Sequence, residues 1–141
     1  MSLSAAIKAS ASALDAERAR LEVAVSNIAN AESTRGADGN PYRRRDVVLS
    51  PQNIETFDAA LGRAGAVGVQ VREIVEDQTA FRKRYEPSHP DADPEGYVSV
   101  PNVDVPEEMV DMVGAARAYQ ANITAINVIR DTVQRSLELG K

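Results

Sequence analysis

Apolar residues recur with helical spacing at both ends of the chain. The segment from about Ser4 to Asn30 contains neither glycine nor proline, and its apolar residues follow a 4-3 spacing. This spacing is typical of a helix that presents one apolar stripe, as in a coiled coil. We therefore predict a long N-terminal helix, with Arg18 as the one charged position in a stripe of Ile7, Ala11, Leu14, Leu21, Val25 and Ile28.

A second long helix is predicted after Pro106. Proline is favoured in a first helical turn, and Glu107 and Glu108 next to it complement the positive end of the helix dipole. Gly140 is expected to end this helix. Arg130 is the one charged position in a second 4-3 stripe of Met109, Met112, Ala116, Tyr119, Ile123, Ile126, Val133 and Leu137.

Apolar residues also flank the second stripe, at Val110, Val113, Val128 and Ile129. A helix that is apolar on more than one face normally contacts more than one partner. The polar middle of the chain offers little surface to cover both helices. We therefore predict an assembly interface between chains, made of Ile7, Leu14, Leu21, Val25, Ile28, Met109, Met112, Tyr119, Ile123, Ile126, Val133 and Leu137.

The middle of the chain has a different pattern. It holds every proline except Pro106 and most of the glycines. Short runs typical of strands span residues 42–49, 68–75 and 97–100, separated by turn-rich segments. A short helix is predicted over residues 54–63. The pattern favours a small β-hairpin or meander inserted between the two helices.

The predicted fold is mainly α, with a small β insertion between two long terminal helices that pack as a coiled-coil-like pair. We expect three regions: the N-terminal helix in residues 1–35, a small β-rich region in residues 36–105 and the C-terminal helix in residues 106–141. This pattern fits a subunit of a helical assembly. It also fits a soluble helical-hairpin adaptor or chaperone.

Composition removes several classes of function. The net charge is −5, and no region has the excess of lysine and arginine that holds nucleic acid. The absence of cysteine excludes disulfides, Cys-ligated zinc and a cysteine nucleophile. No apolar run is long enough for a transmembrane helix, and the N-terminus lacks the pattern of a cleaved secretory signal.

The candidate chemical groups favour no enzyme. His89 is the only histidine, so a metal site lacks further His or Cys donors. Asp91, Asp93 and Glu95 alternate, but the calcium-loop pattern is absent. Ser33 and Thr34 have no neighbouring base, and nucleophile-elbow and phosphate-loop motifs are missing. We therefore predict no catalytic residue, cofactor or metal.

Two basic triplets, residues 43–45 and 82–84, lie in the middle region. Alternate residues of a strand point to opposite faces, so each triplet is expected to divide between two sides. One interpretation is a solvated strand edge that discourages further pairing. The other is pairing with acids of a neighbouring chain, such as Glu107, Glu108 and Asp111.

Motifs at both ends resemble the axial proteins of the bacterial flagellum, the family of rod, hook and hook-associated proteins. Residues 25–31 with Thr34, and residues 102–105, 108–112 and 117–122, carry this resemblance. Residues 41–44 and 85–98 resemble the proximal-rod members, and the short chain lacks the large insertion of other members. The matching motif positions are Asn27, Asn30, Thr34, Asn102, Glu108, Arg117, Tyr119 and Asn122.

The resemblance implies a structural role. A chain of this family is expected to leave the cell unfolded through the flagellar type III export apparatus, without a cleaved signal peptide. It would polymerise in the periplasm into the proximal rod of the basal body, which transmits torque from motor to hook. The expected neighbours are copies of the chain and the rod proteins FlgB, FlgF, FlgG and FliE, and the terminal helices would form the inner tube.

Overall fold

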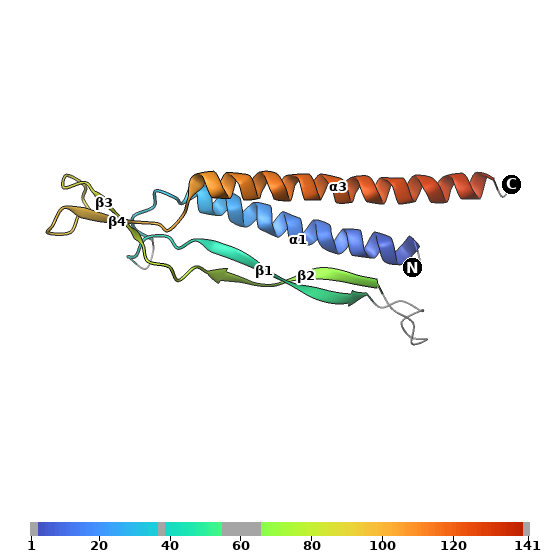
Figure 1. The fold of residues 1–141 in the computed structure, drawn as a ribbon, viewed down its shortest axis with the longest axis horizontal. Coiled ribbons are helices and arrows are strands. Elements are labelled where there is room, and N and C mark those ends of the chain that lie inside the picture. Colours follow the sequence, from blue (N-terminus) through green and yellow to red (C-terminus); the bar gives the residue numbers. More distant parts are fainter. Residues whose placement is uncertain (1–2, 37–38, 55–65, 140–141) are drawn as a thin grey trace. The chain divides into compact units, whose positions relative to one another are not determined.

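The computed structural model describes residues 3–36, 39–54 and 66–139 (Figure 1). Within these residues, one long helix precedes and another follows four strands along the chain. The prediction of two terminal helices with a small β region between them is confirmed. The elements are α1 (Leu3–Ala29), β1 (Arg45–Ile54), β2 (Ala66–Glu76), β3 (Arg82–Tyr85), β4 (Tyr97–Val100) and α3 (Val105–Glu138).

The strands form two separate pairs. Strand β1 is hydrogen-bonded to β2, and β3 is hydrogen-bonded to β4. The β3–β4 pair is antiparallel, with Arg82 opposite Val100 and Tyr85 opposite Tyr97. Strand β3 was not among the predicted runs, because its charged residues lack the apolar alternation of a strand. The helix predicted for residues 54–63 lies outside the described residues except for Ile54, which ends β1. The helix end predicted at Gly140 also lies outside the described residues.

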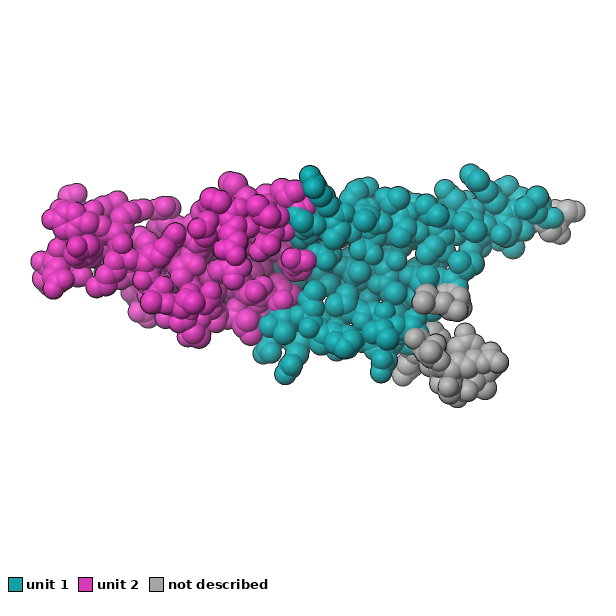
Figure 2. All heavy atoms as spheres, in the orientation of Figure 1, with its two compact units in different colours: residues 1–19, 48–73, 114–141 teal, residues 20–47, 74–113 magenta. Residues whose placement is uncertain are grey.

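Two compact units share these elements (Figure 2). The first unit comprises residues 1–19, 48–73 and 114–141, and the second comprises residues 20–47 and 74–113. Each unit therefore contains part of α1, part of α3 and part of the β1–β2 pair. Within the described residues, no helix combines the length and the hydropathy needed to cross a membrane.

The first unit packs α1 closely against the β1–β2 pair. Its core cluster joins Ala5 of α1 to Ile54 and Ala66 of the strands, with Ala9 packed against it. The small side chains of α1 allow the strands to approach the helix. At Gly68 the approach is so close that a Cβ atom would lie 2.5 Å from the Ser12 hydroxyl oxygen, which accepts a hydrogen bond from the Val69 N–H at 3.1 Å.

This close approach makes a testable prediction about two glycines. Gly68→Ala is expected to lower the free energy of unfolding by about 1–3 kcal/mol, because the added methyl group forces Ser12 or the strand to move. Gly114 of α3 has open space around its Cβ position. Gly114→Ala is therefore expected to raise stability by about 0.5–1 kcal/mol through helix propensity. Urea unfolding followed by circular dichroism measures both, and equal effects at the two sites would contradict the packing described.

The second unit has its core beside the β3–β4 pair. Val98 and Val103 are completely buried, and Val100 and Pro101 are nearly so. The Arg82 guanidinium group donates to the carbonyl oxygens of Pro101 and Val103, which satisfies backbone groups beside this core. The chain then enters α3 through Asp104, whose carboxylate accepts from the Glu107 N–H at 3.4 Å as a helix N-cap.

Candidate functional site

A buried carboxamide joins α1 to β1 and α3 in the second unit. Asn27, 1% exposed, donates to the Arg45 carbonyl oxygen at 2.8 Å and to Glu108 Oε2 at 2.9 Å. Its Oδ1 atom accepts from the Arg45 N–H at 3.0 Å and from the Tyr42 hydroxyl at 2.9 Å. Every hydrogen-bonding position of the side chain is thus used, so only a group with two donors and two acceptor positions fits here.

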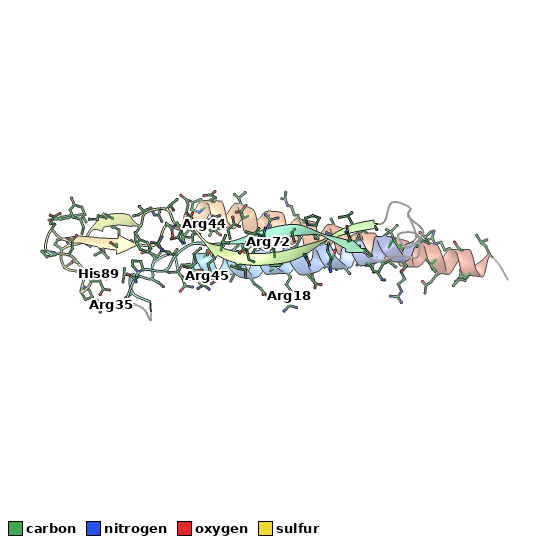
Figure 3. The ribbon with its side chains drawn as sticks, turned by 90° about the horizontal axis from the view of Figure 1, so that it is seen from below. Arg18, Arg35, Arg44, Arg45, Arg72 and His89 are labelled. Carbon is green, nitrogen blue, oxygen red and sulfur yellow. The ribbon has the colours of Figure 1, made fainter. Side chains whose placement is uncertain are left out.

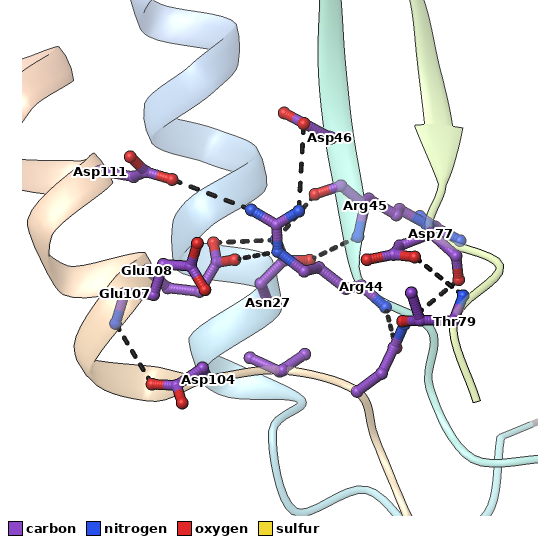
Figure 4. Close-up of polar contacts among 12 residues, drawn as sticks. Asn27, Arg44, Arg45, Asp46, Asp77, Thr79, Asp104, Glu107, Glu108 and Asp111 are labelled. Carbon is purple, nitrogen blue, oxygen red and sulfur yellow. Dashed lines mark hydrogen bonds and ion pairs between the residues drawn. The ribbon is translucent and has the colours of Figure 1, made fainter. Parts of the chain in front are cut away.

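Arg44 neutralises the buried carboxylate of Glu108 (Figure 4). Its Nε atom lies 2.6 Å from Glu108 Oε1, and the two side chains are only 19% and 3% exposed. Asp46 and Asp111 lie further away, each at 3.9 Å. Burial acts to lower the pKa of Arg44, but the hydrogen bond and the charge of Glu108 outweigh it, so the pKa is raised.

Asn102 ties this pair to the loop after β2. Its Oδ1 atom accepts from the Arg44 N–H at 2.9 Å. Its Nδ2 atom donates to the Asp77 carbonyl oxygen at 3.2 Å and to the Thr79 hydroxyl at 2.8 Å. The Asp77 N–H in turn donates to the Arg44 carbonyl oxygen at 2.8 Å. We call Asn27, Arg44, Asn102 and Glu108 the polar cluster.

The loop beside the polar cluster is expected to make the free energy of unfolding depend on pH in the acid range. The Thr79 N–H donates to Asp77 Oδ1 at 2.8 Å, and this bond, followed by the Thr79 hydroxyl, holds the pKa of Asp77 below its ordinary value of 3.8. A lowered folded-state pKa contributes stability that is present above the unfolded-state pKa and is lost as pH falls through the folded-state pKa.

Asp77→Asn is therefore expected to lower stability modestly at pH 7, to change it little at the acid end of the range, and so to reduce the loss of stability as pH falls. The asparagine oxygen still accepts from the Thr79 N–H but does not titrate. Urea unfolding at pH 7, 4 and 3 measures the difference. An acid dependence equal to that of the unmodified chain would contradict this role of Asp77.

A second set of contacts fixes the chain where it leaves α1. Asn30 donates to the Ser26 carbonyl oxygen at 2.9 Å and accepts from the Ser33 hydroxyl at 3.3 Å. The Thr34 hydroxyl donates to Asp91 Oδ2 at 2.9 Å, and Arg35 lies 2.7 Å from Asp91 Oδ1. Both oxygens of one carboxylate thus hold the segment after α1.

The loop that carries Asp91 is itself held by hydrogen bonds. His89 accepts from the Asp91 N–H at 3.1 Å. Asp93 accepts from the N–H groups of Glu95 and Tyr97 at 3.0 and 2.8 Å. These acids therefore act as local caps and anchors, and His89 helps to orient the residue that binds Thr34.

The predicted interface residues stay at least partly exposed within the chain. None of the twelve is buried. Val25 and Met109 are about half exposed and Leu137 is 67% exposed, while the others are intermediate. The charged stripe positions Arg18 and Arg130 are both exposed, which agrees with side chains that extend from the stripe edge into solvent.

The buried face of each helix is offset from the predicted stripe. On α1 the buried residues are small, namely Ala5, Ala16, Ala24 and Asn27. On α3 they are Glu108 and Ala115. The chain therefore uses small residues for its internal contacts and leaves the larger apolar side chains of both helices partly uncovered.

The first basic triplet divides between two sides, although only Arg45 of the three lies in β1, and one of the two interpretations of the triplet is wrong for Arg44. Arg44 points inward, while Arg43 and Arg45 line a hollow on the other side of the chain. Pairing of Arg44 with Glu108 and Asp111 of a neighbouring chain was one interpretation of the sequence. The structure places these acids beside Arg44 within one chain, because the helix start and the segment before β1 converge there.

The structure brings part of the family motif together. Asn27, Asn102 and Glu108 form the polar cluster, and Asn30 and Thr34 shape the exit from α1. Arg117, Tyr119 and Asn122 lie on α3 in the first unit, where Asn122 donates to the Ala118 carbonyl oxygen of its own helix at 2.9 Å.

Sequence reasoning missed the roles of Arg44, Tyr42 and Asp91 as internal partners. The only sequence signal for these roles was that the three residues lie within the motif segments 41–44 and 85–98. The side chains of the polar cluster are hydrogen-bonded to one another and to neighbouring residues of the second unit, so the cluster is suited to fixing α1, β1 and α3 together.

Comparisons with known proteins agree on one family. Residues 7–37 match the family model described as "Flagella basal body rod protein", and residues 95–139 match "Flagellar basal body rod FlgEFG protein C-terminal". The chain is 44% identical to the flagellar basal-body rod protein FlgC of Bacillus subtilis, covering 96% of both chains. It is 46% identical to FlgC of Salmonella typhimurium over 92% of both, and 36% identical to FlgC of Borreliella burgdorferi over 99% of this chain and 98% of the relative.

Proposed function

The chain belongs to the FlgC family of flagellar basal-body rod proteins and is a structural rod subunit, and we propose that it polymerises in the proximal rod and transmits torque from motor to hook. The observation that carries this proposal is the set of twelve apolar stripe residues, none of which the chain buries by itself. Exposed apolar surface on long helices gains stability when neighbouring chains cover it.

In the proposed assembly, residues 1–35 and 106–141 form the inner tube and residues 36–105 lie outside it. Long helices that each contact several neighbours make many weak contacts, which must shear together under torque. The polar cluster supports this role, because it anchors both helices to the β region with charged and hydrogen-bonded groups.

The proposed partners are copies of this chain and the rod proteins FlgB, FlgF, FlgG and FliE. The proposed route is export by the flagellar type III apparatus into the periplasm without a cleaved signal peptide. The family membership supports this route, and the exposed apolar stripes support assembly with neighbouring chains.

Hydrogen exchange on free and assembled protein tests the proposal. In the free chain we expect amides of α1 and α3 in the first unit, and above all those of residues 120–138, to exchange at least about 100-fold faster than in the rod, since isolated helices depend on packing. Amides of the second-unit core around Val98 and Val103 should change little. Strong protection of both helices in a monomer would favour the helical-hairpin adaptor instead.

A further inference from the structure

A cationic hollow in the second unit lies beside the exit from α1. It has a volume of about 520 Å³ and is lined by three arginines, Arg35, Arg43 and Arg45, together with Tyr42 and Phe81. Arg35 and Arg45 are 67% and 49% exposed. Figure 3 shows Arg45 on the side of the chain opposite to Arg44, which the polar cluster occupies. The volume of the hollow falls within the range of about 300–1,000 Å³ that is usual for ligand sites.

Two of the arginines are held in place by aromatic rings. The Arg43 guanidinium group lies 4.3 Å from the centre of the Phe81 ring and donates to the carbonyl oxygens of Asp77 and Thr79, both at 3.2 Å. The Arg45 guanidinium group lies 5.6 Å from the centre of the Tyr42 ring. Groups that are already oriented lose less conformational entropy when an anion binds.

The positive charge of the hollow is closely matched at Arg35, which lies 2.7 Å from Asp91 Oδ1, but only loosely matched at Arg45. Among the lining residues that the structure describes, Glu76 is the only acid. Its contact with Arg45 is 3.5 Å long, and the Glu76 side chain is 49% exposed. A strong charge-assisted bond measures about 2.7–2.9 Å. Glu76 thus places a carboxylate at the edge of the hollow without engaging Arg45 closely, so a better placed carboxylate can replace it.

We propose that this hollow binds an acidic segment of another polypeptide, a carboxylate of which engages Arg45 more closely than Glu76 does. The flat guanidinium groups match carboxylate geometry. The Tyr42 and Phe81 rings, with Pro41 and Gly36, provide apolar surface for the peptide chain between the acids. That the peptide comes from a neighbouring rod subunit rests on the proposed function, whereas the binding itself does not.

The full-length chain titrated with a capped tetrapeptide, acetyl-Asp-Glu-Asp-Glu-amide, tests the proposal. Binding is followed by NMR shifts of the amides of Ser33, Tyr42 and Arg45. We expect saturable binding that weakens as salt is raised. Arg45→Gln should weaken binding about five-fold, because one partly screened ion pair is lost. Glu76→Gln should strengthen it about two- to five-fold, because the competing carboxylate is removed.

Arg72→Gln is the matched control. Arg72 is 69% exposed, contacts its neighbour Glu73 at 3.7 Å and does not line the hollow, so its loss should leave binding unchanged. Equal weakening by Arg72→Gln and Arg45→Gln would reveal non-specific charge attraction and overturn the site. Saturation by inorganic phosphate but not by the tetrapeptide would overturn the peptide ligand. Since the isolated chain is used, a failure of the proposed assembly would not affect the result.

Discussion

Glu108→Ala is expected to lower the free energy of unfolding by about 3–5 kcal/mol, because it leaves the largely buried charge of Arg44 without a close partner. Arg44 is only 19% exposed, and Glu108 provides its close contact at 2.6 Å. The change also removes an acceptor of the buried Asn27 carboxamide, which lies 2.9 Å from Glu108 Oε2. Urea unfolding at pH 7, followed by circular dichroism, measures the loss.

Two further variants separate the buried contact from charge in general. Asp111→Ala removes a half-exposed acid that lies 3.9 Å from Arg44, and it should cost no more than about 1 kcal/mol. Glu108→Gln loses the charge and keeps only one acceptor oxygen, so its amide nitrogen faces the donor of either Arg44 or Asn27, and a loss of about 1.5–3 kcal/mol is expected. If Asp111→Ala cost as much as Glu108→Ala, the stability would come from the summed charge around Arg44 and not from the buried pair.

The two long helices were predictable because local signals agree with the final structure. The N-terminal segment lacks helix breakers, and Pro106 and Glu107 lie where a first turn accepts them. The structure begins α3 at Val105 and caps it with Asp104. Agreement of propensity, periodicity and capping made the helix bounds accurate to within about two residues.

The buried face of the helices was less predictable. Periodicity alone favours the stripe with the largest apolar residues, but large residues also mark contacts between chains. The internal contacts instead use residues such as Ala5 and Ala16, since the β1–β2 pair approaches α1 closely at Gly68. Many alanines lie on other faces of the same helix, so the sequence offers no way to identify the buried ones.

The polar cluster was only partly predictable for a different reason. Asn27, Asn102 and Glu108 could be identified as motif positions, yet Asn102 and Glu108 are joined by Arg44, which is 64 residues from Glu108 along the chain. A basic triplet next to a strand is normally exposed. That Arg44 points inward depends on the convergence of α1, β1 and α3, which no local pattern of the triplet reveals.

Val25→Asp is expected to reduce incorporation into rods by at least about 100-fold while the free chain keeps its fold. Val25 is 52% exposed in the chain, so an aspartate at this position remains solvated before assembly. In the proposed interface the same carboxylate would be buried without a partner. Such a charge costs several kcal/mol, and each 1.4 kcal/mol is a factor of ten in the association constant.

Gln120→Asp provides the control for this change. It also places a carboxylate at an exposed position in the interior of a long helix, but position 120 is not in the predicted stripe. Its incorporation should stay within about three-fold of the unmodified chain, measured as subunit content of purified basal bodies and as swimming motility. Circular dichroism of the free variants verifies that both still fold. If the two variants assembled equally well, the apolar stripe of α1 would be a solvated face, and neighbouring chains would have to meet elsewhere.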